Sequence, residues 1–244
     1  GDQANMPRRT SSALALTIPA LWNRLRSGAR STSGARDWQQ ETGGVPVHDM
    51  DQLYAQAAGL KPLLLSKVKY WATLSKGCFK VQTDSGGVGR SNSSGGSQYQ
   101  FKRWDQLADS QFRVSWPALK GLQRAVEKLH RCYNHDASRL LDVCRASIAF
   151  RKPSELATCL RAIAVDSDVQ LLSSKNRLAP DYNAESTGGY RDVNLTLRVI
   201  TEEASTLGLD MHLCEVQLLL VAFAEVKSDK GHKHYVEFRD AQGM

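Results

Sequence analysis

Polar and apolar side chains alternate along two stretches of the chain, residues 190–200 and 211–219. Successive side chains of a β-strand point to opposite faces, so each stretch predicts a strand with one apolar face and one polar face. A connection of roughly ten residues favours antiparallel neighbours. Pairing of this kind would gather one polar patch, which consists of Asp192, Asn194, Arg198, Glu215 and Gln217.

A further carboxylate, Asp142, directly precedes the apolar run 143–150, which is expected to form a buried strand with Arg145 on its non-core face. One carboxylate at a strand end and a second, Glu215, on a nearby strand fit a magnesium-binding pair for phosphoryl chemistry. The alternative is a polar sheet face that only meets solvent, as is common in antiparallel sheets.

Basic side chains recur every four residues in the segment 116–133, where Lys120, Arg124 and Lys128 would form one stripe of a helix. Such a stripe binds phosphates or lies in water. Pro117 stands at an N1-like position, and apolar residues follow at helical spacing: Leu119, Leu122, Val126 and Leu129.

The remaining patterns predict helices and strands in alternation. Residues 153–164 indicate a helix that begins with a proline, 168–174 a strand, and 220–240 a closing helix. Helices that alternate with strands, followed by two consecutive strands, indicate an α+β (α/β-like) domain with a mixed β-sheet of about five strands flanked by helices.

The net charge of +7 lies entirely in residues 1–115, which suits a polyanionic partner such as RNA or a nucleotide, or a merely solvated surface. Residues 6–36 hold six arginines and no acidic residue. This composition is typical of an organelle transit peptide, and the alternatives are a weak signal-peptide core or an RNA-binding tail.

The division expected along the chain is a basic N-terminal segment (1–48), an N-terminal helical part (49–82), a Gly/Ser-rich loop (83–98) and a catalytic domain (99–244). The five cysteines lack zinc-ligand spacing, which indicates reduced thiols and an intracellular protein, cytoplasmic or organellar. No apolar run approaches the roughly 20 residues that cross a bilayer, so no membrane partner is expected.

The order of the motifs is informative in its own right. "LLDVCRASIAF" follows the lysine-bearing segment, and "KNRLAPDY", "GGYRDVNLTLRV", "CEVQ" and "GHKHY" come after it. This succession, over about 116–240, resembles the synthetase domain of the RelA/SpoT family, which has a nucleotidyltransferase-like fold.

The resemblance implies Mg²⁺ as cofactor, ATP as pyrophosphate donor, and the 3′-hydroxyl of a guanine nucleotide or a tRNA end as acceptor. Asp142 matches the magnesium-binding aspartate, and Glu215 the second carboxylate, a metal ligand or general base. Tyr190 matches the tyrosine that stacks on the acceptor base. The expected nucleotide-binding residues are Lys120, Arg124, Lys128, Arg145, Lys175, Arg177, Tyr190, Arg191, Asn194 and Gln217.

Several positions depart from the family pattern, and three of them replace a basic or histidine side chain. Ala118 and Leu219 stand where the family has arginines, and Asn194 stands where it has a histidine. The alternative function is therefore a catalytically degenerate module of the same fold that binds nucleotide or RNA, or another protein. A purely structural role is the third option. Retention of Asp142 and Glu215 favours the enzyme.

Overall fold

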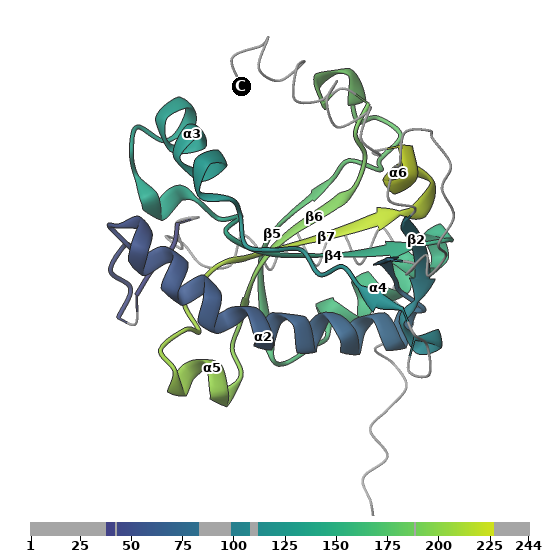
Figure 1. The fold of residues 1–244 in the computed structure, drawn as a ribbon, viewed down its shortest axis with the longest axis horizontal. Coiled ribbons are helices and arrows are strands. Elements are labelled where there is room, and N and C mark those ends of the chain that lie inside the picture. The colour runs from purple at the N-terminus through teal and green to yellow at the C-terminus, as the bar shows by residue number, and fades with distance from the viewer. Residues whose placement is uncertain (1–37, 42, 83–98, 108–111, 188, 227–244) are drawn as a thin grey trace, which may run out of the picture.

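The computed structural model describes residues 38–41, 43–82, 99–107, 112–187 and 189–226 (Figure 1). The helices are α2 (Met50–Ser75), α3 (Leu122–Cys132), α4 (Pro153–Ala164), α5 (Glu202–Thr206) and α6 (Val221–Val226). The strands are β1 (Cys78–Gln82), β2 (Tyr99–Arg103), β3 (Arg113–Val114), β4 (Cys144–Phe150), β5 (Val169–Asn176), β6 (Val193–Val199) and β7 (Cys214–Leu220). The expected loop 83–98, most of the basic segment 1–48 and residues 227–240 of the expected last helix lie outside the described residues.

The described strands form one seven-stranded sheet in the order β2-β1-β4-β7-β6-β5, with β3 beside β1. Strands β4 and β7 run parallel, whereas the other pairs are antiparallel. The α+β class with a mixed sheet is thus confirmed. The sheet is larger than the expected five strands because β1, β2 and β3 are only two to five residues long, too short for a strand pattern to stand out in the sequence.

Each central strand separates its side chains between an apolar face and a polar face of the sheet. Ile148, Leu195 and Val216 are fully buried on the apolar face. They share one core with buried residues of α2 and α4, and Figure 1 shows α2 running along that side of the sheet. The opposite face carries Arg145 and Glu215. This polar face is where the expected site residues meet.

Helix α2 is the long support of the apolar face. Its buried residues recur at three- and four-residue spacing: Leu53, Ala57, Leu60, Leu64, Val68, Trp71, Ala72 and Ser75. The carboxylate of Asp49 caps its first turn by accepting from the Gln52 amide at 2.6 Å. Gly77 follows the helix, and a Cβ there would lie 2.6 Å from Ile148 Cγ2. Only glycine therefore allows α2 to end so close to β4.

The boundaries of α3 differ from the expectation. The helix begins at Leu122 with Gly121 as its N-cap, so Pro117 and Lys120 precede it. Its buried residues are Ala125 and Leu129, whereas Leu122 and Val126 are exposed. The expected apolar stripe was wrong at these two positions, because a helix at the rim of the domain buries only a narrow stripe.

Within the described residues, no helix is both long and apolar enough to span a membrane.

Candidate functional site

The antiparallel pairing of β6 and β7 brings an amide and a carboxylate together on the polar face. Asn194 lies opposite Gln217, and Thr196 lies opposite Glu215. The Asn194 side-chain amide donates to Glu215 Oε2 at 2.9 Å, and Gln217 Nε2 donates to Glu215 Oε1 at 3.0 Å. Both carboxylate oxygens are therefore held in place by amide donors, as the alternation in the sequence predicted.

The parallel pairing of β4 and β7 adds a cation beside the same carboxylate, because Arg145 lies opposite Glu215. Burial raises the pKa of Glu215 above its ordinary value, and the nearby Asp142 charge raises it further. The Asn194 hydrogen bond and the charges of Lys128 and Arg145 oppose the shift without cancelling it. Glu215 is thus a carboxylate that accepts a proton more readily than usual.

Asp142 lies two residues before β4 and is held between two lysines. Lys120 Nζ lies 2.6 Å from its Oδ2, and Lys128 Nζ lies 3.2 Å from its Oδ1 in an ion pair without hydrogen-bond geometry. Burial alone would raise the pKa of Asp142, but Lys128 and Lys120 outweigh it and hold the pKa below its usual range. Asp142 therefore stays ionised, and its charge acts on Glu215, whose pKa is shifted the other way.

The two carboxylates have the donor atoms that Mg²⁺ prefers. Magnesium is usually held by one or two carboxylates plus substrate phosphates rather than by an all-protein cage. No cluster of three or more metal-ligating side chains occurs among the described residues. Asp142 Oδ1 is buried and accepts no hydrogen bond, so one carboxylate oxygen is suited to an additional cation.

A second group of expected residues forms the lip of the polar face, before β6. Arg177 Nη1 donates to the fully buried Asp192 at 2.6 Å, and the Tyr190 hydroxyl donates to the other Asp192 oxygen at 2.9 Å. Tyr190 also packs against a small apolar cluster that includes Leu219. Asp192, expected in the open polar patch, is instead the buried anchor of the lip, because its two partners satisfy both of its oxygens.

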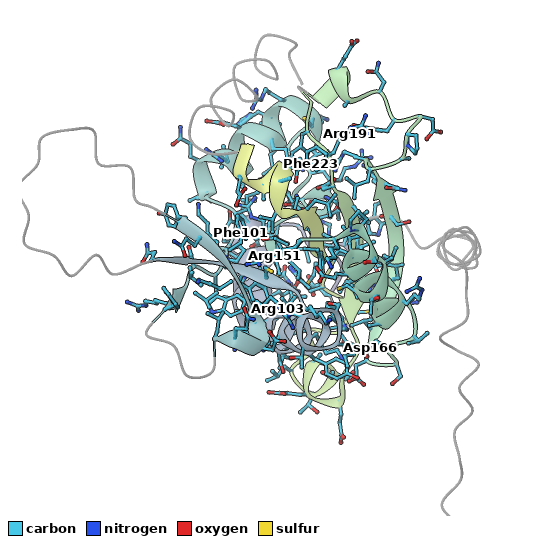
Figure 2. The ribbon with its side chains drawn as sticks, turned by 90° about the vertical axis from the view of Figure 1, so that its right-hand side faces the viewer. Phe101, Arg103, Arg151, Asp166, Arg191 and Phe223 are labelled. Carbon is cyan, nitrogen blue, oxygen red and sulfur yellow. The ribbon has the colours of Figure 1, made fainter. Side chains whose placement is uncertain are left out.

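Arg191 closes the loop that precedes this lip. Its guanidinium donates to the carbonyls of Arg177, Ala179 and Tyr182 at 3.1, 3.0 and 3.2 Å. Figure 2 shows Arg191 and Asp166 at opposite ends of the molecule. Arg191 is thus used in shaping the loop.

Three other expected residues form no hydrogen bond or ion pair with the two carboxylates. Arg124 is exposed on α3, one turn from Lys128. Lys175 is exposed on β5, opposite Asn194. Arg198 is buried, and its Nη2 donates to Gln40 Oε1 at 3.0 Å rather than facing the carboxylates.

The sequence patterns missed three residues that hold this arrangement together. The Tyr54 hydroxyl donates to the Lys120 carbonyl at 2.5 Å, and Lys61 Nζ donates to the Arg145 carbonyl. The buried Gln39 contacts the segments that lead into β4 and β7. Each contact spans 66 or more residues of sequence, so no local pattern could have revealed it.

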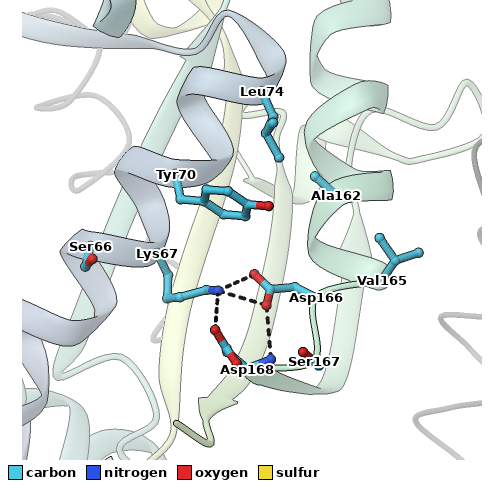
Figure 3. Close-up of a pocket in the computed structure, with 9 residues that line it drawn as sticks. All are labelled: Ser66, Lys67, Tyr70, Leu74, Ala162, Val165, Asp166, Ser167 and Asp168. Carbon is cyan, nitrogen blue, oxygen red and sulfur yellow. Dashed lines mark hydrogen bonds and ion pairs between the residues drawn. The ribbon is translucent and has the colours of Figure 1, made fainter. Parts of the chain in front are cut away.

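A hollow of about 500 Å³ lies on the other side of the sheet, between α2 and the end of α4 (Figure 3). Lys67 Nζ pairs there with Asp166 at 2.6 Å and Asp168 at 3.1 Å. The Trp71 indole also donates to Asp166 at 2.7 Å. This ion-pair cluster closes the α2–α4 contact and is separate from the polar face.

No family model and no curated protein matches the chain. Solved structures with a similar arrangement include the small alarmone synthetase 1 from Bacillus subtilis bound to AMPCPP, at 14% identity and TM-score 0.45 over 79% of this chain and 87% of that one. The same synthetase bound to its product pppGpp has 17% identity and TM-score 0.41 over 51% of this chain and 66% of that one.

A GTP pyrophosphokinase family protein from Streptococcus pneumoniae has 14% identity and TM-score 0.39 over 54% of this chain and 62% of that one. In the last two comparisons the chain spans less than two thirds of the other protein's length. The solved structures to which the chain is similar are thus alarmone synthetases and a GTP pyrophosphokinase family protein.

Proposed function

We propose that this chain transfers the β,γ-pyrophosphate of ATP to the 3′-hydroxyl of a nucleotide or of a tRNA end. One observation carries the proposal: the two expected carboxylates have different partners, with Glu215 held by the amides of Asn194 and Gln217 and Asp142 by the ammonium groups of Lys120 and Lys128. The pKa of Glu215 is raised in these surroundings and that of Asp142 is lowered. Carboxylates separated in this way suit a proton acceptor beside a permanently ionised partner. Lys120, Lys128 and Arg145 around them match the charge of a polyphosphate.

The reaction follows from this arrangement. The acceptor 3′-oxygen attacks the β-phosphorus of ATP, the bond from that phosphorus to the α,β-bridging oxygen breaks, and AMP leaves. Glu215 takes the proton of the attacking hydroxyl while Asn194 and Gln217 fix the orientation of its carboxylate. Most of the catalysis would be positioning and charge neutralisation, as in other phosphoryl transfers.

Asp142 and Glu215 are the residues that would hold Mg²⁺, together with phosphate oxygens of ATP. Bound there, the ion would neutralise part of the charge of the transferred group. Lys120 and Lys128, which now pair with Asp142, would then contact the phosphates. Their ion pairs keep the charge of Asp142 compensated until the nucleotide arrives.

The acceptor would lie at the lip. Tyr190 is fixed by its hydroxyl on Asp192, and we expect its ring to stack on the acceptor base. Arg177, which neutralises Asp192, would keep this anchor from repelling the acceptor's phosphates. Separate assays with free nucleotides and with tRNA distinguish a nucleotide acceptor from an RNA end.

The test is incubation of the protein with γ-labelled ATP, Mg²⁺ and separate acceptors: GTP, GDP, ATP and tRNA. We expect label transfer to at least one acceptor, and at least about a 100-fold loss of transfer in Asp142→Asn and Glu215→Gln. Asp166→Asn is the matched control, because Asp166 also pairs with a lysine at 2.6 Å, on the other side of the sheet. Its transfer rate should stay near that of the wild type.

The outcomes separate the candidate functions. Transfer that persists in both carboxylate variants contradicts the proposed roles. No transfer to any acceptor, with ATP still bound, contradicts the enzyme and favours the degenerate nucleotide-binding module.

A further inference from the structure

The side chain of Gln39 connects the two segments that carry the carboxylates. Its Nε2 donates to the Leu140 carbonyl at 3.1 Å and to the Leu213 carbonyl at 3.0 Å. Its Oε1 accepts from the Leu213 amide at 2.7 Å. Leu140 lies two residues before Asp142, and Leu213 lies two residues before Glu215. One amide group therefore bridges the backbones next to both carboxylates.

This bridge lies directly before the parallel ladder of β4 and β7, which includes Glu215 but not Asp142. The parallel ladder of β4 and β7 begins at Cys144 and Cys214, so Asp142 stands outside it. One further hydrogen bond holds this stretch of backbone: the Lys120 amide donates to the Val143 carbonyl at 3.1 Å. Without Gln39, the position of Asp142 relative to Glu215 would depend on the ladder that begins two residues later, at Cys144.

Glutamine is suited to this position by its chemistry. Its side chain is fully buried, and a carboxamide offers two donors and an acceptor at the end of a flexible stem. Both donors and the acceptor are used. An apolar replacement would leave two carbonyls and one amide of the backbone buried without this partner, and a carboxylate would face two carbonyl oxygens.

We propose that Gln39 is a positioning residue that sets the spacing of Asp142 and Glu215 and thereby the Mg²⁺ affinity of the site. The inference rests on the proposed function, since it assigns the two carboxylates to one magnesium–ATP site. Outer contacts that orient metal ligands typically change metal affinity or activity by about 10- to 100-fold when removed. Gln39 acts through the backbone and touches neither carboxylate.

The neighbouring Gln40 offers a matched control. It lies in the same segment, and its Oε1 accepts from Arg198 at 3.0 Å, away from both carboxylates. Gln39→Met keeps an unbranched stem of similar length without the amide, and Gln40→Met makes the same change next to it. Gln39→Asn keeps the amide on a shorter stem. A general loss of packing in this segment would affect the Gln39 and Gln40 variants alike.

The experiment measures binding of the α,β-methylene analogue of ATP by calorimetry across a Mg²⁺ titration. We expect the Mg²⁺ concentration for half-maximal binding to rise by about tenfold or more in Gln39→Met, and by less in Gln39→Asn. In Gln40→Met it should stay within about twofold, as expected for a residue that contacts no part of the site. Equal shifts in Gln39→Met and Gln40→Met, or no shift in either, would overturn the proposal.

A second measurement on the wild type covers the case in which Gln39→Met does not fold. Hydrogen exchange of the Leu213 amide, which donates to Gln39, should slow when Mg²⁺ and the analogue bind together, because the bridge and the metal site stabilise the same spacing. The Gly77 amide, which donates to Ala72 in the turn after α2, is the control. An unchanged Leu213 rate in the saturated complex contradicts the proposal.

The transfer assay distinguishes this inference from the proposed function. A protein that binds the analogue with Mg²⁺ but transfers no pyrophosphate contradicts the enzyme, while the Gln39 variants still test the bridge. A protein that binds no analogue at any Mg²⁺ concentration contradicts both.

Discussion

The Asn194 amide and the Glu215 carboxylate meet across β6 and β7 at 2.9 Å, and this contact orients the residue best placed to accept a proton. Gln217 holds the second carboxylate oxygen at 3.0 Å. Because both donors come from neighbouring strands of one rigid sheet, the carboxylate has little freedom to rotate. Asn194 thus serves to fix the orientation of the Glu215 carboxylate.

Asn194→Leu should slow pyrophosphate transfer by about tenfold at neutral pH and move the acidic limb of its pH–rate profile to higher pH. The Asn194 hydrogen bond lowers the pKa of Glu215, so its loss raises a pKa that burial has already raised. More of Glu215 is then protonated at a given pH. The control is Thr196→Val, because Thr196 lies on the same strand as Asn194 and directly opposite Glu215. A limb that moves to lower pH would contradict the assignment.

The ion pair of Lys120 and Asp142 should be strongly coupled. Asp142→Asn leaves a buried lysine without its partner and should reduce the free energy of unfolding by about 3 kcal/mol. Because the pKa of Asp142 is lowered in the fold, this contribution is present above the ordinary value of 3.8 and is lost as the pH falls through the folded pKa. Urea denaturation at pH 7 measures it.

A double-mutant cycle with Lys120→Met gives the interaction directly. The sum of the two single-variant losses in the free energy of unfolding should exceed the loss in the double variant by about 1–3 kcal/mol. Strictly additive losses would mean that Lys120 and Asp142 do not interact in solution.

Local patterns predicted the parts of the fold that depend on local residues. The alternation in 190–200 and 211–219 placed Asn194, Glu215 and Gln217 on one face because a strand has a fixed period of two. Pro153 and the helical spacing after it placed α4 at its observed bounds. Such features follow from backbone geometry, which the sequence encodes within one element.

The other parts depend on contacts between distant segments. Asp192 follows the same alternation as Asn194, yet it is fully buried because Arg177 and Tyr190 neutralise and satisfy it. Gln39 reaches Leu213 across 174 residues. Polarity and spacing alone do not distinguish a buried anchor from an open site residue, since that depends on which partners the fold supplies.

Asp192→Ala should be among the most destabilising changes at the lip. It leaves Arg177 without its partner and should reduce the free energy of unfolding by about 3 kcal/mol. Tyr190→Phe removes one hydrogen bond from the same anchor and should cost about 1 kcal/mol. Urea denaturation of both variants measures these losses. Equal losses would show that Arg177 gains nothing from Asp192.

Two substitutions of Tyr190 distinguish the contribution of its ring to acceptor binding from that of its hydroxyl. Tyr190→Phe should keep acceptor affinity within about threefold, whereas Tyr190→Ala should weaken it by about tenfold or more, the value of one stacked base. Equilibrium binding of the acceptor found in the transfer assay measures both. Equal affinity in Tyr190→Ala and the wild type would exclude the ring as a stacking surface.

His212 should make the stability of the fold depend on pH. Its side chain is fully buried beside Gln56, with Nδ1 3.1 Å from the Gln56 Oε1, and burial lowers its pKa from 6.5 to about 3. Between these values the unfolded chain binds a proton that the folded chain does not. Stability is therefore lost as the pH falls below 6.5.

At pH 5 the loss from His212 should be about 2 kcal/mol relative to pH 7.5. The free energy of unfolding from urea titrations at both pH values measures it, with His212→Gln as the comparison. The variant has no group that titrates in this range at the same position, so its stability should fall less over the same interval. A wild type and a variant with equal losses would show that His212 is already protonated in the folded protein, because only a neutral buried imidazole links folding to proton release.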